Sequence, residues 1–409
     1  MEKNLVIVYW KKHILTAVYE NDILCEILLD DPHGGNLGNI YVGRIQNVVK
    51  NINAAFVEFE RKKCGYYSLS DPDAHFFLNH KKNTKAVPGD ELLIQVVKDP
   101  VKTKPAMLTG KITLPGQYLV LTAKKPVVSV SAKITDKAEI RRLKAATEPF
   151  VTENYGFIVR TGALGQPEEV LGREAKRLGE QFEVLLKRAC HSTCFSKLYV
   201  GMPAYVKYIL DHPDLNKITT DIKDVYDRVS QALKSWERSV PLVFYRDESW
   251  PLVKLKSLPT HIQRALDPKV WLKSGGFLMI QPTEAMVVID VNTGRYTGKK
   301  TTEETYFKVN MEAAAEIARQ IRLRNLSGII VIDFIDMKDS QMRRSLFESF
   351  GKFLDRDPVK TVLVDTTRLN LVEMTRKKER KPLYELLGKP CPVCGGWGFV
   401  DAGEERDHE

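Results

Sequence analysis

The chain has 409 residues, of which 43% are apolar and 28% are charged, and this composition excludes a disordered or fibrous protein. Its length exceeds what a single compact core holds, so about two to four structural units are expected. An excess of 62 Lys and Arg over 52 Asp and Glu gives a formal charge of +10, which favours polyanionic partners such as nucleic acid.

The N-terminal segment predicts three short strands joined by polar turns, NLVIVYW, HILTAVYE and ILCEILL. These strands cannot bury a core by themselves, so we expect them to pack on later parts of the chain. The segment contains Lys11, Lys12, Glu20 and Asp22, which excludes a signal-peptide core, and no later window reaches about 18 uninterrupted apolar residues. We therefore expect a cytoplasmic protein without a membrane span.

Residues 38–120 alternate β-branched and aromatic residues in five short stretches that glycines punctuate. The last two stretches are VPGDELLIQVVKD and ITLPGQYLVLT. This pattern predicts a small closed β-barrel. Phe56 and Tyr66 fall beside basic residues, so they are either core side chains or platforms for stacked bases, and the pattern alone favours the core.

The chain from 121 to 272 predicts mixed α/β structure. Up to residue 200, the strands VVSVSA and FIVRT alternate with the helices DKAEIRRLKAATEPFVTE and PEEVLGREAKRLGEQFEVLLKRAC. Shorter strands and helices are expected between 201 and 272, where prolines mark their edges.

Two apolar runs in the last third of the chain each end on an aspartate. MVVIDVNTGRY places Asp290 at the end of one predicted strand, and GIIVIDFIDM places Asp333 at the end of the next. Between them, Thr301 and Glu304 have the spacing of a capping box and begin the predicted helix TEETYFKVNMEAAAEIARQIRLRN. A strand–helix–strand unit predicts two parallel, neighbouring strands whose carboxyl ends face one crevice.

This pair of aspartates predicts a shared Mg²⁺ site. Asn292 follows Asp290 and adds a neutral oxygen ligand, and Mg²⁺ takes one or two carboxylates together with waters and a phosphate. A single strand-terminal aspartate more commonly caps a turn or a helix. Two unpaired carboxylates at equivalent strand ends, however, repel each other unless a cation lies between them. The pattern indicates phosphoryl chemistry, with Asp336 as a weaker additional candidate.

Six cysteines in a chain of this length do not predict a disulfide framework. Cys391 and Cys394 form a CPVC pair followed by glycines, which is the spacing of a zinc knuckle. A closed tetrahedral site needs four ligands, so two more come either from another chain or from another segment. The internal candidates are Cys190 and Cys194 with His191, although ACHSTCF continues a predicted helix and fits a helix end with buried thiols better.

Four motifs, in this order, resemble the catalytic core of the ribonuclease E/G family, nearest to its ribonuclease G branch: VVIDVNTGR, EAAAEIARQIRLRNLSGIIVIDFIDM, LVEMTRKK and CPVCGGWG. The resemblance extends from about Gly38 to Val400, and the block 310–337 is its most specific part. It implies an α/β multidomain fold. The implied parts are an RNase H-like part (1–37 with 201–272), an inserted OB-fold barrel (38–120), a 5′-sensor α/β subdomain (121–200), a DNase-like α/β catalytic subdomain (273–385) and a short zinc-link segment (386–409).

The activity that the resemblance implies is Mg²⁺-dependent endonucleolytic cleavage of single-stranded RNA, in rRNA processing and mRNA turnover. Cleavage would leave 5′-phosphate and 3′-hydroxyl ends and would be stimulated by a 5′-monophosphate on the substrate. Asp290 and Asp333 would hold the Mg²⁺, Asn292 would support them, and water would attack the scissile phosphorus.

The resemblance also implies binding residues away from the catalytic centre, and it reverses the preference for a core role of the two barrel aromatics. The implied RNA contacts are Phe56, Tyr66, Lys98 and Lys104. The implied ligands of a 5′-phosphate are Arg160 and Thr161. Cys391 and Cys394 would hold a structural Zn²⁺ that is shared between the two chains of a homodimer.

Two other functions are considered on the sequence. A catalytically weak RNA-binding scaffold is disfavoured because Asp290, Asn292 and Asp333 are all present. A nucleotide hydrolase built on the same carboxylates is disfavoured because the chain has no GxxxxGK[ST] loop to hold a nucleoside phosphate.

Overall fold

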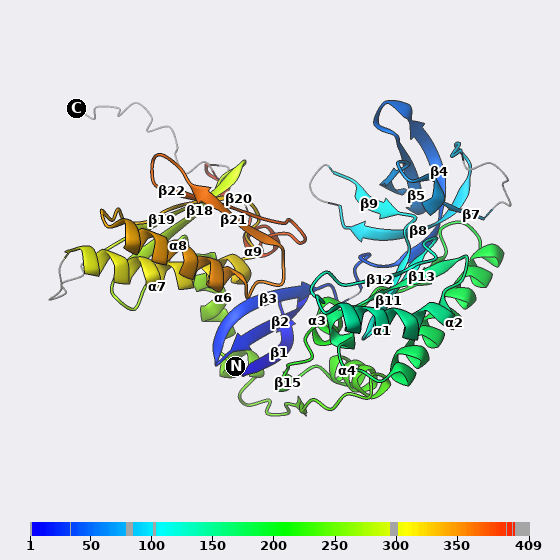
Figure 1. Cartoon of the computed structure of the whole chain (residues 1–409), viewed down its shortest axis with the longest axis horizontal. Helices are drawn as coiled ribbons and strands as arrows, with labels where there is room; N and C mark the ends of the chain where they lie inside the picture. The colour runs from blue at the N-terminus through cyan, green and yellow to red at the C-terminus, as the bar shows by residue number, and fades with distance from the viewer. Residues whose placement is uncertain are drawn as a thin grey trace, which may run out of the picture. The chain divides into compact units, whose positions relative to one another are not determined.

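The protein forms two compact units, each with its own sheets and core (Figure 1). Unit 1 comprises Met1–Leu29, Asn216–Asp227 and Val240–Glu409, and unit 2 comprises Asp30–Leu215 and Arg228–Ser239. The structure, a computed structural model, describes residues 2–32, 34–78, 85–100, 104–294, 302–389, 391–394 and 396.

Unit 2 contains a small closed β-barrel. Its strands are hydrogen-bonded in the order β4–β5–β6–β9–β8, and β8 also pairs with β4 to close the ring. The inward-facing Tyr41, Val57 and Leu92 are fully buried, because successive side chains of a strand alternate between its two faces. The predicted barrel is confirmed. Its strands are β4 (Ile40–Val49), β5 (Ala54–Glu60), β6 (Lys63–Ser68), β8 (Glu91–Lys98) and β9 (Ala106–Thr109), with short β7 (Phe76–Phe77) and β14 (Lys197–Tyr199) beside them.

One stretch that the sequence assigned to the barrel belongs to another sheet. ITLPGQYLVLT forms β10 (Thr113–Pro115) and β11 (Leu119–Ala123), and β11 pairs with β13 of the following α/β segment. Leu119 and Leu121 are fully buried in the core of that segment, which explains the pairing. The assignment of this stretch to the barrel is therefore wrong, and β9 takes its place by pairing with both β6 and β8.

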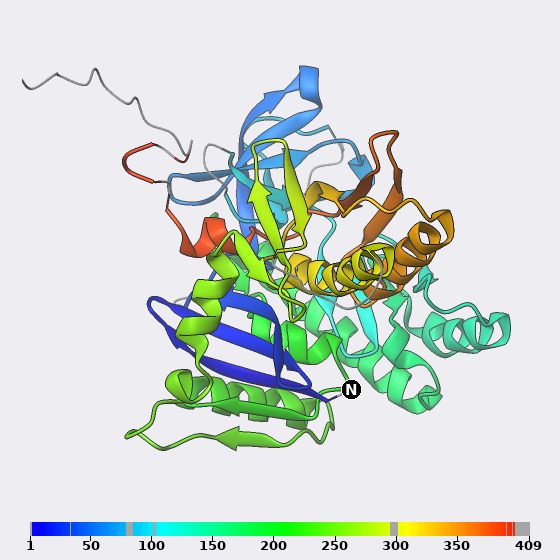
Figure 2. The same ribbon diagram turned by 90° about the vertical axis from the view of Figure 1, so that its left-hand side faces the viewer.

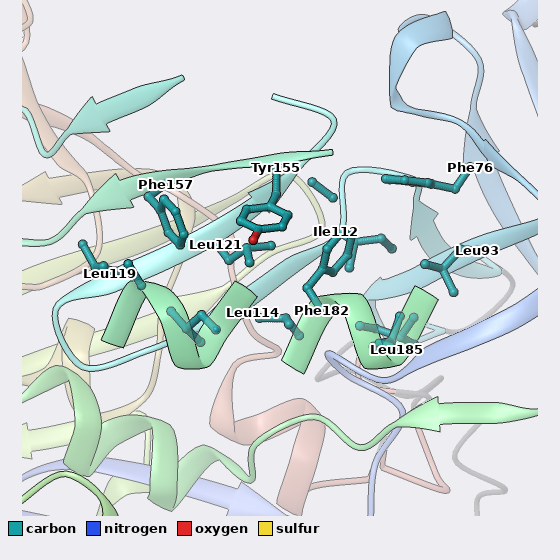
Figure 3. Close-up of a cluster of buried hydrophobic side chains, with 14 of the residues drawn as sticks. Phe76, Leu93, Ile112, Leu114, Leu119, Leu121, Tyr155, Phe157, Phe182 and Leu185 are labelled. Carbon is teal, nitrogen blue, oxygen red and sulfur yellow. The ribbon is translucent and has the colours of Figure 1, made fainter. Parts of the chain in front are cut away.

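A four-stranded sheet with two helices forms the other core of unit 2, in the order β10–β11–β13–β12. Figure 3 shows Phe182 and Leu185 of α2 among the buried side chains of this sheet, and the Phe182 and Tyr155 ring centroids are 5.7 Å apart in an edge-to-face arrangement. The predicted α/β segment is confirmed. Its elements are β12 (Val128–Val130), α1 (Lys137–Thr147), β13 (Tyr155–Val159) and α2 (Glu168–His191), and α3 (Ala204–Asp211) follows.

Unit 1 begins with a five-stranded sheet in the order β16–β15–β1–β2–β3. As expected, the N-terminal strands pack on later parts of the chain: β1 pairs in parallel with β15, and Val6 and Leu15 share a core with Leu258 and Leu383. The elements are β1 (Lys3–Trp10), β2 (His13–Glu20), β3 (Ile23–Asp30), β15 (Lys217–Thr220), β16 (Leu242–Phe244), α5 (Leu252–Leu255), α6 (Leu258–Leu266) and α9 (Leu383–Leu387). Helix α4 (Lys223–Ser235) begins in unit 1, and its residues from Arg228 on belong to unit 2.

A six-stranded sheet in the order β17–β18–β19–β20–β22–β21 forms the second part of unit 1. Helices α7 and α8 cover one of its faces (Figures 1 and 2). Ile317 of α7 and Phe350 of α8 lie in the core between these helices and the sheet. The elements are β17 (Lys269–Trp271), β18 (Phe277–Pro282), β19 (Met286–Asn292), α7 (Thr302–Leu323), β20 (Gly328–Asp333), α8 (Ser340–Leu354), β21 (Thr361–Thr366) and β22 (Leu371–Arg376).

The predicted strand–helix–strand unit is confirmed, because α7 connects β19 to β20 and these two strands are parallel neighbours. The proposed capping residue Thr301 lies outside the described residues. The mixed α/β class and the closed barrel are likewise confirmed, whereas the boundaries of the five predicted domains stay predictions. Among the described residues, no helix is both long enough and apolar enough to span a bilayer.

Candidate functional site

Asp290 and Asp333 stand side by side on one face of the six-stranded sheet. In β19, Val287, Ile289 and Val291 are buried under the helices, so Asp290 points to the opposite, exposed face. Asp290 and Asp333 are direct partners in the parallel ladder between β19 and β20. Neighbouring strands lie about 4.8 Å apart, so the two carboxylates are brought close together by the backbone itself.

The electrostatics around the pair are unfavourable for two negative charges. Partial burial and the neighbouring carboxylates of Asp290 and Asp336 raise the pKa of Asp333 above its usual value. Asn292 Nδ2 donates a 2.7 Å hydrogen bond to Asp290 Oδ2 and so fixes that carboxylate. Asn370 Nδ2 donates to Asp336 Oδ1 over 3.2 Å. A cation between these groups would relieve their repulsion.

The donor set fits Mg²⁺ better than a metal that needs a full protein cage. In the described part of the chain, no group of three or more His, Cys, Asp or Glu side chains is arranged to hold a metal ion. Mg²⁺ usually keeps several waters and binds one or two carboxylates together with substrate phosphate. Asp290 and Asp333 could supply those carboxylates and leave the remaining positions to water and a phosphodiester.

Asn310 supports the loop after β20, and the sequence did not identify it. Its side chain is fully buried on α7, where Nδ2 donates to Ile335 O over 2.8 Å and Oδ1 accepts from Ile335 N over 3.0 Å. These two hydrogen bonds hold the backbone at Ile335, which lies between Asp333 and Asp336 in the chain. The signal in the sequence is a single amide in an otherwise apolar helix face, VNMEAAAEIA.

A second group of predicted residues lies in one row across the barrel. In the ladders, Phe56 of β5 is opposite Tyr66 of β6, Tyr66 is opposite Met107 of β9, and Met107 is opposite Lys98 of β8. Phe56 and Tyr66 are half-buried, and Met107 is 38% exposed. Lys104 is also exposed. Since the neighbouring Tyr67 fills the core, the two aromatics are left on the outer face.

This row, Phe56, Tyr66, Met107 and Lys98, combines an apolar surface with an ammonium group, which suits a base and its phosphate. Met107 was missed because a methionine in a four-residue strand carries no signal of its own. Only the registers of β9 with β6 and with β8 place it between Tyr66 and Lys98.

Arg160 and Thr161 lie at the end of β13, where Thr161 is exposed and begins a short 3₁₀ turn (Thr161–Ala163). Arg160 Nη1 donates to Gly116 O over 2.9 Å, and Arg160 Nη2 pairs with Asp211 Oδ1. Burial raises the pKa of the Asp211 carboxyl, but Lys207 and Arg160 outweigh it, so the pKa is lowered and Asp211 stays ionised. Asp211 is a positioning residue that sequence spacing could not reveal, because it is 51 residues from Arg160.

The two CPVC cysteines do not form a disulfide, and Cys391 is exposed. The described residues place no third cysteine, histidine or carboxylate with them in a metal-binding group. Cys194, an internal candidate, is half-buried, and burial and Glu91 raise the pKa of its thiol to about 11. Of the predicted zinc-link segment, the structure describes 386–389, 391–394 and 396.

Comparison with known proteins places this site in a family. The family model for the Ribonuclease E/G family matches residues 113–379. Ribonuclease G of Haemophilus influenzae is 38% identical over 409 residues, which cover 96% of this chain and 83% of the relative. Ribonuclease G of Escherichia coli K12 is 36% identical over 408 residues, with the same coverages. The chain belongs to the ribonuclease E/G family.

The predicted family, and with it the assignment to the endoribonuclease class, is confirmed. Ribonuclease E of Nostoc sp. is also 36% identical over 414 residues, and the chain spans 59% of that relative's length. The residues matched by the Ribonuclease E/G model include Asp290, Asn292, Asp333, Arg160 and Thr161. The barrel residues precede the matched segment, and the CPVC pair follows it.

Proposed function

We propose that this protein is a Mg²⁺-dependent endoribonuclease that hydrolyses single-stranded RNA to 5′-phosphate and 3′-hydroxyl ends. The observation that carries the proposal is the direct pairing of Asp290 with Asp333 on an exposed sheet face, together with the raised pKa of Asp333. By analogy with other members of the ribonuclease E/G family, its substrates are rRNA precursors and mRNA, and it works in the cytoplasm.

Asp290 and Asp333 would hold the ion, which, when bound, supplies charge neutralisation at the phosphate and makes the attacking water a better nucleophile. Asn292 keeps the Asp290 carboxylate in one orientation through its 2.7 Å hydrogen bond. Asn310 fixes the loop that follows Asp333 through its two bonds to Ile335. The scissile phosphodiester therefore meets a preorganised pair of carboxylates, which lowers the cost of orienting them during the reaction.

The test is incubation of the full chain with a short 5′-labelled single-stranded RNA, with Mg²⁺ and with a chelator. We expect internal cleavage only with Mg²⁺, and products whose 3′ ends are hydroxyls. RNA that is bound but not cut under any divalent cation would instead favour the binding scaffold.

The barrel row is expected to bind RNA bases. Phe56→Ala should weaken the binding of single-stranded RNA by roughly 1 to 3 kcal/mol, because a stacked base loses its aromatic partner. Fluorescence anisotropy with a labelled RNA measures the change. Phe59→Leu is the control, since Phe59 is buried in the barrel core and should alter thermal stability without altering RNA affinity. If Phe56→Ala lowers stability and leaves affinity intact, Phe56 is a core residue.

Arg160 and Thr161 are expected to bind a substrate 5′-monophosphate. The intact protein should cleave a 5′-monophosphorylated RNA faster than the same RNA with a 5′-hydroxyl, and Arg160→Ala should abolish that preference while the rate on the 5′-hydroxyl RNA is kept. Asp211→Asn should weaken the preference in part, because it loosens the guanidinium. Equal rates on the two RNAs in the intact protein would remove the assignment.

Cys391 and Cys394 are expected to share one Zn²⁺ with the same two residues of a second chain, because a closed site needs four thiolates. Metal analysis should give one zinc per two chains, and a strong chelator should release metal and monomers together, as light scattering detects. Replacing both cysteines by serine should do the same, whereas the control Cys190→Ser with Cys194→Ser should not. One zinc per chain in the intact protein would contradict the shared site.

A further inference from the structure

An exposed tryptophan lies on the same sheet face as the catalytic carboxylates. Trp271 is 65% exposed on β17, the edge strand of the six-stranded sheet. The ladders place it opposite Phe277 of β18, and Phe277 opposite Asn292 of β19. Because directly opposed residues of neighbouring strands point to the same face, Trp271 and Phe277 share the face of Asn292.

The neighbouring row runs directly to the two aspartates. Lys269 of β17 is opposite Met279 of β18, Met279 is opposite Asp290, and Asp290 is opposite Asp333. Trp271 is thus two strand spacings from Asn292, or about 10 Å between backbones. If the scissile phosphate lies at Asp290 and Asp333, this distance places the base of an adjacent nucleotide at Trp271.

Lys269, Trp271 and Phe277 form a compact cluster with two aromatic rings and one cation. The Trp271 and Phe277 ring centroids are 5.4 Å apart at an interplanar angle of 61°. Lys269 Nζ lies 4.1 Å from the Trp271 centroid and 3.9 Å from the Phe277 centroid, so the ammonium is held by cation–π attraction. Aromatic faces bind bases by stacking, and a fixed ammonium attracts phosphate.

The backbone under this cluster is fixed. Lys269 N donates to Asp267 Oδ1 over 2.9 Å, and Ile280 N donates to Pro268 O over 2.8 Å. Leu272 N donates to Gly276 O over 2.8 Å and closes the turn between β17 and β18. The exposed Trp271 is therefore presented by a rigid strand pair, which reduces the entropy lost when a ligand binds.

We propose that Lys269, Trp271 and Phe277 form a stacking subsite for one base of single-stranded RNA, next to the scissile phosphate. The inference rests on the proposed ribonuclease activity and adds a specificity-determining contact to it. A single-stranded polyanion fits this face better than an apolar protein surface, because the Lys269 ammonium over the two rings attracts phosphate and would be left unpaired against an apolar partner.

The main test uses Trp271→Ala and Trp271→Phe in the full chain. With a short single-stranded RNA whose cleavage site has been mapped, Trp271→Ala should raise KM by about 5- to 150-fold, the range expected for one lost base stack, with a smaller effect on kcat. Trp271→Phe should restore most of the loss, because it keeps an aromatic face. Trp250→Ala is the matched control: Trp250 is 54% exposed in the same unit but outside the sheet, and its removal should leave KM unchanged.

RNAs with an abasic nucleotide at successive positions then locate the contact. One abasic position near the cleavage site should raise KM of the intact enzyme as much as Trp271→Ala does, and the same position should have no further effect in Trp271→Ala. If the effects of the abasic nucleotide and of Trp271→Ala on KM are additive at every position tested, the subsite is overturned. An unchanged KM of Trp271→Ala would also overturn it. If Trp271→Ala instead changes the molecular mass measured by light scattering and leaves RNA affinity unchanged, Trp271 belongs to an interface between protein chains and the subsite is overturned.

Failure of the subsite is distinguishable from failure of the ribonuclease proposal. An intact protein that cuts the RNA while Trp271→Ala behaves identically contradicts only the subsite. An intact protein that cuts no RNA contradicts the activity, and anisotropy with the uncut RNA then still reports whether Trp271→Ala weakens binding.

Discussion

Asp333→Asn is expected to lower the rate of RNA cleavage by several orders of magnitude and, at the same time, to stabilise the metal-free protein. The rate falls because the carboxylate pair acts mainly on charge that develops in the transition state. RNA affinity should change little, since the barrel row that we propose to bind RNA is unaltered. Single-turnover cleavage with saturating enzyme measures the rate without interference from binding.

The gain in stability follows from the direction of the Asp333 pKa. Partial burial, Asp290 and Asp336 raise this pKa in the folded protein above that of an unfolded aspartate, about 3.9. A raised carboxyl pKa means that the folded state binds the proton more tightly, so its contribution is fully present below the unfolded pKa and is lost as pH rises through the folded pKa. At neutral pH the ionised Asp333 therefore opposes folding, and asparagine removes that effect.

Thermal unfolding in the presence of a chelator tests whether Asp333→Asn stabilises the metal-free protein. Asp333→Asn should unfold at a higher temperature than the intact protein at pH 7. The difference should shrink as the pH falls through the raised pKa of Asp333 and should vanish below about 4, where the aspartate is protonated in both states. Millimolar Mg²⁺ should raise the unfolding temperature of the intact protein, because ligands that bind only the folded state stabilise it, but not that of the variant. A variant that cuts RNA at a near-normal rate would eliminate Asp333 from the site.

The arrangement of the carboxylates could be predicted because it depends on local pattern and chain connectivity. Apolar runs ending in Asp290 and Asp333, with an amphipathic helix between them, predict parallel neighbouring strands, and β19 and β20 have that relation. Each aspartate follows four consecutive apolar residues, so aligning the two runs also places Asp290 opposite Asp333. Each step uses residues that are close in sequence or linked by one helix.

The remaining features depend on pairings between distant segments, which periodicity does not encode. ITLPGQYLVLT has the alternation of a barrel strand, yet burial of Leu119 and Leu121 against the α/β core decides its partner. The row from Phe56 to Lys98 arises from three separate strand registers. Trp271 gave no signal in the sequence, because its place beside Asn292 depends on two consecutive antiparallel ladders.

A buried ion pair at the end of β22, in the six-stranded sheet, gives the largest expected effect on stability. Arg376 Nε lies 2.6 Å from Asp357 Oδ2, and both side chains are 2% exposed. Arg376 Nη1 also donates to Asn325 Oδ1 over 2.8 Å and to Leu326 O over 3.0 Å. Since Arg376 is opposite Gly328 in the ladder, these bonds anchor the start of the strand that ends in Asp333.

Arg376→Met is expected to lower the free energy of unfolding by about 3 to 5 kcal/mol, because it leaves the Asp357 carboxylate buried without its partner. Urea unfolding at neutral pH measures the loss. Lys223→Met is the control, since the Lys223–Asp227 pair is 65% and 57% exposed and its removal should cost only about 0.3 to 0.5 kcal/mol. Adding Asp357→Leu to Arg376→Met should recover part of the stability, because the unpaired charge is then gone. If the single and double variants are equally unstable, packing around Arg376 and not the buried charge holds the start of β20.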